Sequence, residues 1–152
     1  MIFISHRGNI SGKNIALEND PIYIDSAISM GYDVETDIRI IDNCFFLGHD
    51  TAQHKVNIEW IMNRKNSLWI HAKNLNCLNF FSKHMQDKYR FFWHQNDDYT
   101  LTSNNIIWAY PGSVLSDNSI AVMPENAKYK KEEILNCYGI CSDFISLYEE
   151  NK

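Results

Sequence analysis

The first third of the chain carries three segments whose polar side chains could move protons or bind a cation. His6 closes a short apolar segment at the N-terminus, and His49 follows a second apolar run. Between them, Glu35 and Asp37 alternate with other residues, so both carboxylates fall on one face of an extended strand. Histidine can donate or accept a proton near neutral pH, and paired carboxylates suit a hard divalent cation. These residue types predict a site where the three segments end.

An ordinary surface strand would show the same alternation, with its carboxylates in water and its apolar side on the core. Two features favour a site instead. The residues after the carboxylates predict a hairpin that turns at 42–43 and ends at GHD, residues 48–50. Upstream, the first apolar segment stops abruptly at SHRG, residues 5–8.

Four short motifs follow one another in this region: HRG at 6–8, EN at 18–19, AISMGYDVETDI from Ala27 and HD at 49–50. In order and approximate spacing they resemble the glycerophosphodiester phosphodiesterase family, which belongs with the phosphatidylinositol-phospholipase-C-like phosphodiesterases. Further along, WIHAK at 69–73 is similar to that family's ExK strand, and CSDF at 141–144 to its late TD strand. The resemblance implies hydrolysis of a phosphodiester on a (β/α) barrel, here in a shortened form.

Phosphodiester hydrolysis needs a base for the nucleophile, an acid for the leaving oxygen and positive charge around the phosphate. The resemblance assigns the two proton-transfer roles to His6 and His49, on opposite sides of the phosphate. Arg7 and Lys73 would hold the phosphate and stabilise its added charge. The small phosphodiester that these groups would bind is the expected partner of the protein.

The resemblance also implies a divalent metal ion. Glu35 and Asp37 would supply oxygen ligands, and His71 stands where the family's ExK strand has a third carboxylate. Histidine ligates divalent metals but favours zinc or manganese over calcium. The expected cofactor is therefore a divalent ion whose identity, among magnesium, calcium, manganese and zinc, stays open.

Two further positions are expected to support the site. Glu18 matches the glutamate of the family's ENT motif, although Asp20 replaces the threonine. His94, together with Asp97 and Asp98, would either contribute to substrate specificity or belong to an ordinary polar loop. The sequence favours neither of these two interpretations.

The elements that must hold these residues alternate between strand and helix. Besides the central hairpin, strands are expected at 2–5, 68–73, 89–93, 106–110, 120–123 and 140–142. Helices are expected from Pro21 to a closing Gly31, then at 56–64, 75–88, 130–138 (closed by Gly139) and 143–150. This alternation predicts an α/β protein with a parallel sheet.

Polar residues at the carboxyl ends of strands suit both a barrel and a doubly wound sheet, and the residues alone do not decide between them. The resemblance favours the barrel. A full barrel takes about 250 residues, whereas this chain has 152. The expected fold is therefore a reduced TIM-like (β/α) barrel with some helices missing, in a single domain over residues 1–152.

The composition narrows the class of protein. With 45% hydrophobic and 22% charged residues and no long apolar run, the chain is expected to lack a transmembrane segment. Its net charge of −5 argues against nucleic acid as a ligand, but permits a small phosphorylated substrate held by a few cations. No secretory signal precedes the first strand, and the four cysteines lack zinc spacing, which favours a cytoplasmic protein with reduced cysteines.

One side of the expected barrel, called the thin side below, has no helices to cover its strands. The links at 95–105 and 111–119 are too short and polar for covering helices, yet the strands that they join are strongly apolar. We therefore expect a symmetric homodimer through this side, with Trp93, Trp108 and Tyr110 at the interface. In the alternative, these aromatic residues point inward and fill the barrel.

Three functions are compatible with these features. The first is metal-assisted hydrolysis of a small glycerol- or sugar-linked phosphodiester. The second is a related reaction in surface-polysaccharide or nucleotide-linked glycerol metabolism, and the third is binding of a phosphorylated ligand without turnover. The presence of both His6 and His49 favours an enzyme, because a binding protein needs cations but no acid and base.

Overall fold

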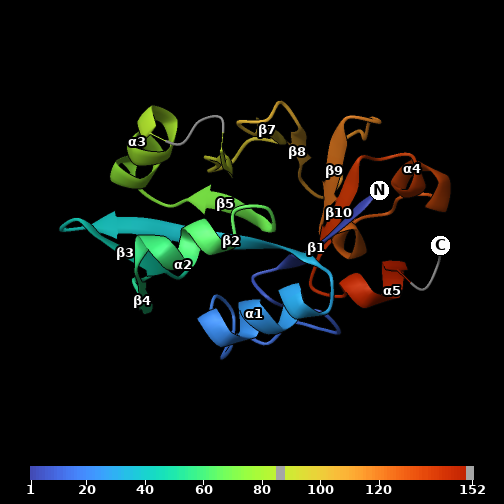
Figure 1. Cartoon of the computed structure of the whole chain (residues 1–152). Coiled ribbons are helices and arrows are strands. Elements are labelled where there is room, and N and C mark those ends of the chain that lie inside the picture. Colours follow the sequence, from blue (N-terminus) through green and yellow to red (C-terminus); the bar gives the residue numbers. More distant parts are fainter. Residues whose placement is uncertain (85–87, 150–152) are drawn as a thin grey trace.

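The computed structural model describes residues 1–84 and 88–149, and its strands form one curled sheet with helices around the outside (Figure 1). Within those ranges seven strands pair in parallel, in the spatial order β6 (Arg90–Phe92), β5 (Leu68–Ala72), β2 (Asp33–Ile41), β1 (Ile2–His6), β10 (Gly139–Ser142), β9 (Ser119–Val122) and β8 (Ile107–Ala109). The expected α/β class with a parallel sheet is confirmed.

Three more strands pair antiparallel with this sheet. β3 (Cys44–Leu47) runs back along β2 and is followed by β4 (His54–Val56), and β7 (Tyr99–Leu101) pairs with β8. The turn between β2 and β3 falls at Asp42 and Asn43, whose φ angles of 48° and 59° are those of a two-residue hairpin turn. The predicted hairpin is therefore confirmed. β7 lies within a link that was expected to be only a polar loop.

The helices are α1 (Pro21–Ser29), α2 (Ile58–Asn63), α3 (Leu75–His84), α4 (Lys131–Leu135) and α5 (Ile145–Glu149), with a short 3₁₀ helix η1 (Pro124–Asn126). α1 begins as predicted, because Asp20 accepts hydrogen bonds from the first-turn amides, and Gly31 follows its end at φ 93°. α2 begins later than expected because Asn57 caps it. Residues 85–87 and Glu150, expected in helices, lie outside the described residues.

Gly139 does not close a helix, contrary to the expectation, and the predicted helix at 130–138 already ends at Leu135. Gly139 is instead the first residue of β10, paired with Ile2 of β1 and Ile120 of β9. A Cβ atom there would lie 2.5 Å from Ile2 Cγ1 and 2.9 Å from Ile2 O. Close approach of two strands therefore requires the glycine.

β2 is the strand that connects the parts of the site. Its first half pairs in parallel with β1 and β5, and its second half pairs antiparallel with β3. The register places Glu35 opposite His6 on β1, and Asp37 opposite His71 on β5. Paired residues of neighbouring strands point to the same face of a sheet. The histidines and carboxylates therefore share one face.

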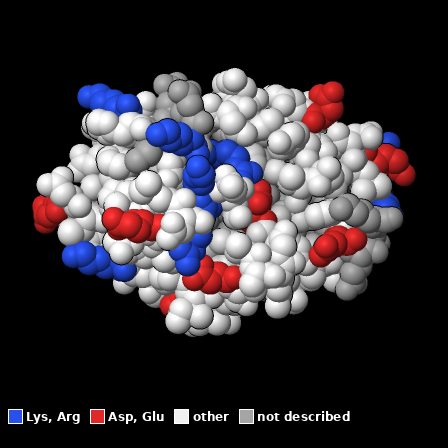
Figure 2. All heavy atoms as spheres, in the orientation of Figure 1, with Lys and Arg blue, Asp and Glu red and all other residues white. Residues whose placement is uncertain are grey.

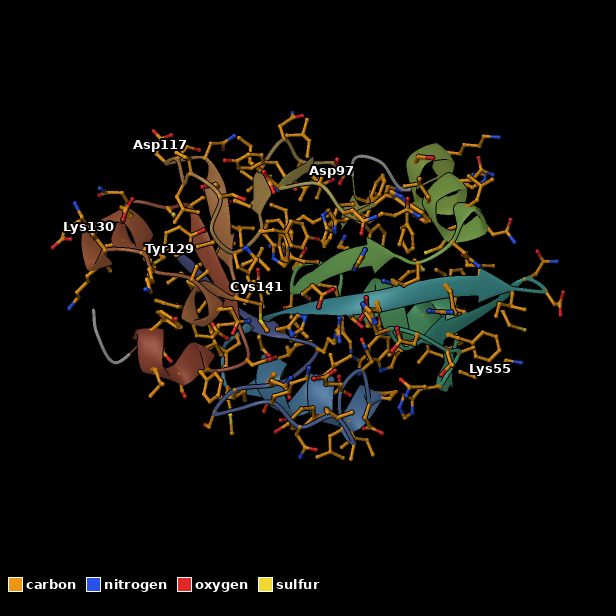
Figure 3. The ribbon with its side chains drawn as sticks, turned by 180° about the vertical axis from the view of Figure 1, so that it is seen from behind. Lys55, Asp97, Asp117, Tyr129, Lys130 and Cys141 are labelled. Atoms are coloured by element: carbon orange, nitrogen blue, oxygen red, sulfur yellow. The ribbon has the colours of Figure 1, made fainter. Side chains whose placement is uncertain are left out.

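The two largest hydrophobic clusters pack on opposite faces of the curled sheet. One fills the inside of the curl and includes Ile4, Trp69, Trp108 and Cys141. Cys141 is completely buried and lies near the middle of the molecule (Figure 3). The other cluster lies between the outer face of the sheet and the helices, with members on α1, α2 and α3. These two layers are what a curled α/β sheet needs to bury both of its faces.

The curl is bridged between β6 and the link before β8 by hydrogen bonds to and from one serine. Ser103 N donates to Phe91 O at 2.8 Å, Phe91 N donates to Ser103 Oγ at 3.0 Å, and Ser103 Oγ donates to Tyr89 O at 2.8 Å. Among the described residues β6 and β8 do not pair with each other as strands, and these hydrogen bonds connect the two sides of the curl instead. The sheet is therefore a partial barrel with few helices.

The thin side of the curl differs in part from the expectation. In the described part of the chain no helix lies between β6 and β9 in sequence, as predicted. Trp108, however, is only 2% exposed and belongs to the inner cluster, while Trp93 packs against the outer cluster. The inward alternative therefore holds for Trp108. The exposed apolar side chains on this side are instead Leu101 and Val114, at 61% and 82%.

Basic side chains are concentrated on one part of the surface. Lysine and arginine side chains gather in one band between α3 and α2 on the face shown in Figure 2. Lys65, Lys88 and Arg90 line a shallow cavity of ≈ 490 Å³ near the amino ends of β5 and β6.

Among the described residues, no helix combines the length and apolar character needed to cross a membrane.

Candidate active site

A cavity of ≈ 590 Å³ lies at the carboxyl ends of β1, β5, β6 and β8 and is bordered by Glu35 in the first half of β2. Most residues expected at the site line it, namely His6, Arg7, Glu35, His49, His71, Lys73 and His94. The other two, Asp37 and Glu18, form ion pairs with Arg7. The structure thus brings all nine expected positions together, although they are spread from residue 6 to residue 94. Parallel strands produce this gathering because their carboxyl ends share one edge.

His6 is held by a carboxylate from the far end of the chain. Its Nδ1 lies 2.7 Å from Asp143 Oδ1, which also accepts a hydrogen bond from Asn9 Nδ2 at 2.7 Å. A carboxylate only accepts, so Nδ1 carries the proton and Nε2 faces the site, 3.8 Å from Glu35 Oε2. Burial lowers the pKa of His6, but the hydrogen bond to Asp143 and the charge of Glu35 outweigh it and raise that pKa.

Glu35, Asp37 and His71 form a buried cluster that could hold a metal ion, with one ligand atom from each residue and all three atoms within 4.8 Å of one another. Glu35 Oε2 and Asp37 Oδ1 are buried and receive no hydrogen bond from any residue that the structure describes. Unpaired buried carboxylate oxygens are costly unless a cation neutralises them. The oxygen atoms therefore fit a divalent ion.

The orientation of His71 also fits ligation. Its Nε2 lies 3.3 Å from the carbonyl oxygen of His94, whereas its Nδ1 faces Asp37 Oδ1 at 3.1 Å and Glu35 Oε1 at 3.7 Å. Donation from Nε2 to that carbonyl leaves a lone pair on Nδ1, directed at the carboxylates, as a metal ligand requires. The mixed set of two carboxylates and one imidazole suits zinc or manganese as well as magnesium or calcium.

The carboxylates of this cluster have shifted pKa values. Burial and the charge of Asp37 raise the pKa of Glu35. Burial also acts to raise the pKa of Asp37, but the neighbouring His71 and the charge of Arg7 outweigh it, and that pKa lies below its ordinary value. Asn19 supports Asp37 further, because its Nδ2 donates to Asp37 Oδ2 at 2.9 Å and its Oδ1 accepts from Asp37 N at 3.0 Å.

Arg7 and Lys73 place positive charge beside the cluster. Arg7 Nε lies 2.9 Å from Asp37 Oδ2, and Lys73 Nζ lies 3.8 Å from Asp37 Oδ1. Arg7 Nη1 donates to Glu18 Oε2 at 3.0 Å, which places Glu18 in the supporting position that was expected. Arg7 has a positive φ of 54°, a backbone conformation that non-glycine residues rarely adopt.

His49 lies on the turn after β3 and is the most accessible of the site histidines, with 38% of its side chain exposed. Its Nδ1 lies 2.7 Å from Asp50 Oδ1. Burial lowers the pKa of His49, the charges of Arg7 and Lys73 lower it further, and together they outweigh the carboxylates of Asp37 and Asp50. His49 is therefore neutral near pH 7 with Nε2 available.

Besides the charged residues, the cavity has an aromatic part, which is lined by Phe92, Trp108 and Tyr110 and includes His94. The His94 ring stacks on Tyr110, with 3.5 Å between ring centroids, and its Nε2 lies 2.6 Å from the carbonyl oxygen of Asp97. Asp97 stands on the loop between β6 and β7 (Figure 3). Asp97 and Asp98 contribute backbone carbonyls to these contacts, which matches an ordinary polar loop, whereas His94 lines the cavity.

Sequence reasoning missed several residues that the structure places at the site. Asn9 and Asn19 are almost completely buried and bind Asp143 and Asp37. Tyr110, expected at a subunit interface, lines the cavity instead. The sequence did contain positional signals, since Asn19 belongs to the EN motif and Asp143 follows an expected strand in the CSDF segment.

Comparison of the chain with protein-family models, with curated proteins and with solved structures finds no match.

Proposed function

We propose that this protein is a metal-assisted phosphodiesterase that hydrolyses a small glycerol- or sugar-linked phosphodiester. The supporting observation is the pairing of two carboxylate-held histidines, His6 and His49, in one cavity with a candidate cation site. β2, which carries Glu35 and Asp37, pairs with β1, which ends at His6, and with β3, which leads to His49. A site that only binds phosphate needs no such pair.

In the proposed reaction, the cation site and the two basic residues have separate roles. A divalent ion held by Glu35, Asp37 and His71 would supply a Lewis acid for a phosphoryl oxygen. Arg7 and Lys73 bind the remaining phosphoryl oxygens and offset their charge in the transition state.

Proton transfer falls to the two histidines. His49, neutral near pH 7, takes a proton from the attacking water molecule through Nε2 as the water oxygen bonds to phosphorus. As the bond between phosphorus and the leaving alcohol breaks, His6 gives a proton to the alcohol oxygen through its own Nε2, while Asp143 keeps the ring in place.

The partial barrel supports the same proposal at the level of the fold. We assign it to a reduced TIM-like (β/α) barrel, as implied by the resemblance of the HRG, EN and HD motifs. Its parallel strands place the candidate site at their carboxyl ends, where barrels carry their sites.

Hydrolysis of bis(4-nitrophenyl) phosphate tests the proposal. Protein treated with a chelator should be inactive, and one of magnesium, calcium, manganese or zinc should restore release of nitrophenol. If none of these ions supports turnover while calorimetry still detects phosphate binding, the protein is a binding protein and the proposal is wrong.

A further inference from the structure

Arg39 links the metal-binding strand to the turn that carries His49. It lies on β2 two residues beyond Asp37, so its side chain leaves the same face of the strand as the carboxylates. Its guanidinium donates to three successive backbone carbonyls: Nη1 to Asp50 O at 3.1 Å, and Nη2 to Gly48 O at 3.1 Å and to His49 O. One side chain thus holds the whole GHD turn.

The turn itself is tight and brings these carbonyls together. Gly48 has φ +137°, and a Cβ atom there would lie 2.3 Å from Thr51 O. Gly48 N also donates to Asp37 O at 3.0 Å, which ties the start of the turn to β2. Carbonyl dipoles that converge repel one another, and a cationic donor between them offsets that repulsion.

The side-chain hydrogen bond of His49 does not by itself place its ring in the cavity. Asp50, which binds Nδ1, is the next residue in the chain, and its side chain is 89% exposed. A bond between neighbours orients the ring within the turn but does not fix the turn relative to the rest of the site. Arg39 also keeps Nε buried with no hydrogen bond among the described residues. The three carbonyl contacts of the guanidinium offset this unfavourable burial.

We propose that Arg39 is a positioning residue that sets the location of the His49 imidazole relative to Glu35 and Asp37. The inference rests on the proposed role of His49 as the base. Because one strand carries both the carboxylates and the arginine, the distance between the cation site and the base is fixed by a single rigid element.

The principal test is Arg39→Lys, which keeps the positive charge but loses the planar fork that reaches three carbonyls. We expect kcat for bis(4-nitrophenyl) phosphate to fall about 100-fold, because small misplacements of a reacting group have effects of this size. KM, and the affinity for manganese measured by calorimetry, should stay unchanged. Arg39→Gln serves as a second variant if the lysine variant fails to fold.

Arg64→Lys is the matched control. Arg64 donates from Nη2 to Asp25 Oδ2 at 2.7 Å and from Nη1 to Trp60 O at 2.8 Å, and it does not line the cavity. Its replacement removes a comparable guanidinium network elsewhere in the fold. An equal fall in kcat in both variants would mean that Arg39 acts through general stability, and the inference would be wrong.

Two measurements separate positioning from a structural effect. In a His49→Ala background, Arg39→Lys should cause no further loss of activity; a full additional loss would overturn the inference. Independently of turnover, the His49 ring signal in NMR spectra should shift or broaden in Arg39→Lys but not in Arg64→Lys. If the wild-type protein proves inactive with every ion, the proposed function fails, and this NMR comparison alone decides whether Arg39 positions His49.

Discussion

His6 Nδ1 lies 2.7 Å from Asp143 Oδ1, although 137 positions separate the two residues in sequence. Parallel pairing of β1 with β10 places Ser5 opposite Ser142, so the residue that follows each of them reaches the same end of the sheet. Asp143 thereby accepts the hydrogen bond from Nδ1 and holds the His6 imidazole in one tautomer.

The first prediction concerns this pair. Asp143→Asn should lower kcat for a chromogenic phosphodiester about 10²–10⁴-fold, because an amide that donates to Nδ1 favours the opposite tautomer of His6. Asp117→Asn, on the exposed loop before β9 (Figure 3), should leave kcat unchanged. Equal activity of the two variants would remove Asp143 from the mechanism.

The second prediction concerns the two histidines themselves. His6→Ala and His49→Ala should each reduce turnover about 10²–10⁴-fold, because each removes a positioned acid or base. Circular dichroism should show both variants folded. The exposed His84, on α3, provides the control His84→Ala, which should retain wild-type activity. Near-normal turnover in either site variant would exclude that histidine.

The third prediction concerns the metal. His71→Glu should shift preference from zinc or manganese towards magnesium or calcium, because an oxygen ligand replaces a nitrogen ligand. Isothermal titration calorimetry with each ion measures the shift, and an ion present at 100 times its dissociation constant should stabilise the fold by about 2.7 kcal/mol. Absence of binding by both proteins under all conditions would refute the metal site.

The fourth prediction concerns stability and pH. Burial acts to raise the pKa of Asp143, but hydrogen bonds from His6 and Asn9 lower it overall from its ordinary value of 3.8. The unfolded chain therefore binds this proton more readily, and the contribution of Asp143 to stability is complete above pH 3.8 and is lost as pH falls through the folded pKa. Asp143→Asn should lower the free energy of unfolding by about 1.5–3 kcal/mol at pH 5.

Urea denaturation at pH 5 and pH 3 measures this effect. His6 is charged at both pH values because its pKa is raised, so the change isolates the carboxyl group. The difference between wild type and Asp143→Asn should be smaller at pH 3. A difference that is independent of pH would show that the hydrogen bonds of Asp143 do not depend on its charge.

The fifth prediction concerns assembly. The homodimer was expected to use Trp93, Trp108 and Tyr110. On this structure, a dimer through the same side would instead bury Leu101 and Val114, which line a groove of ≈ 390 Å³ there. Light scattering at micromolar concentration should then give twice the chain mass of 17.8 kDa, and Leu101→Glu with Val114→Glu should give the monomer. A wild-type monomer would mean that the short loops alone close this side.

Local rules of the chain were enough for most of the elements, although they missed β4 and β7. The alternation that places Glu35 and Asp37 on one face, the turn at Asp42 and the closing Gly31 all depend on residues within a few positions of one another. Such short-range preferences do not depend on the rest of the fold, so they can be read before the fold is known.

Only the tertiary structure decided which distant groups meet. Gly139 looked like the end of a helix, but the contact that requires it is with Ile2 at the opposite end of the chain. The carboxylate of Asp143 on His6 and the guanidinium of Arg39 on the His49 turn depend likewise on strand order and on how far one strand extends past its neighbour. Strand order results from burying two faces of one sheet, a property of the whole chain that no local pattern encodes.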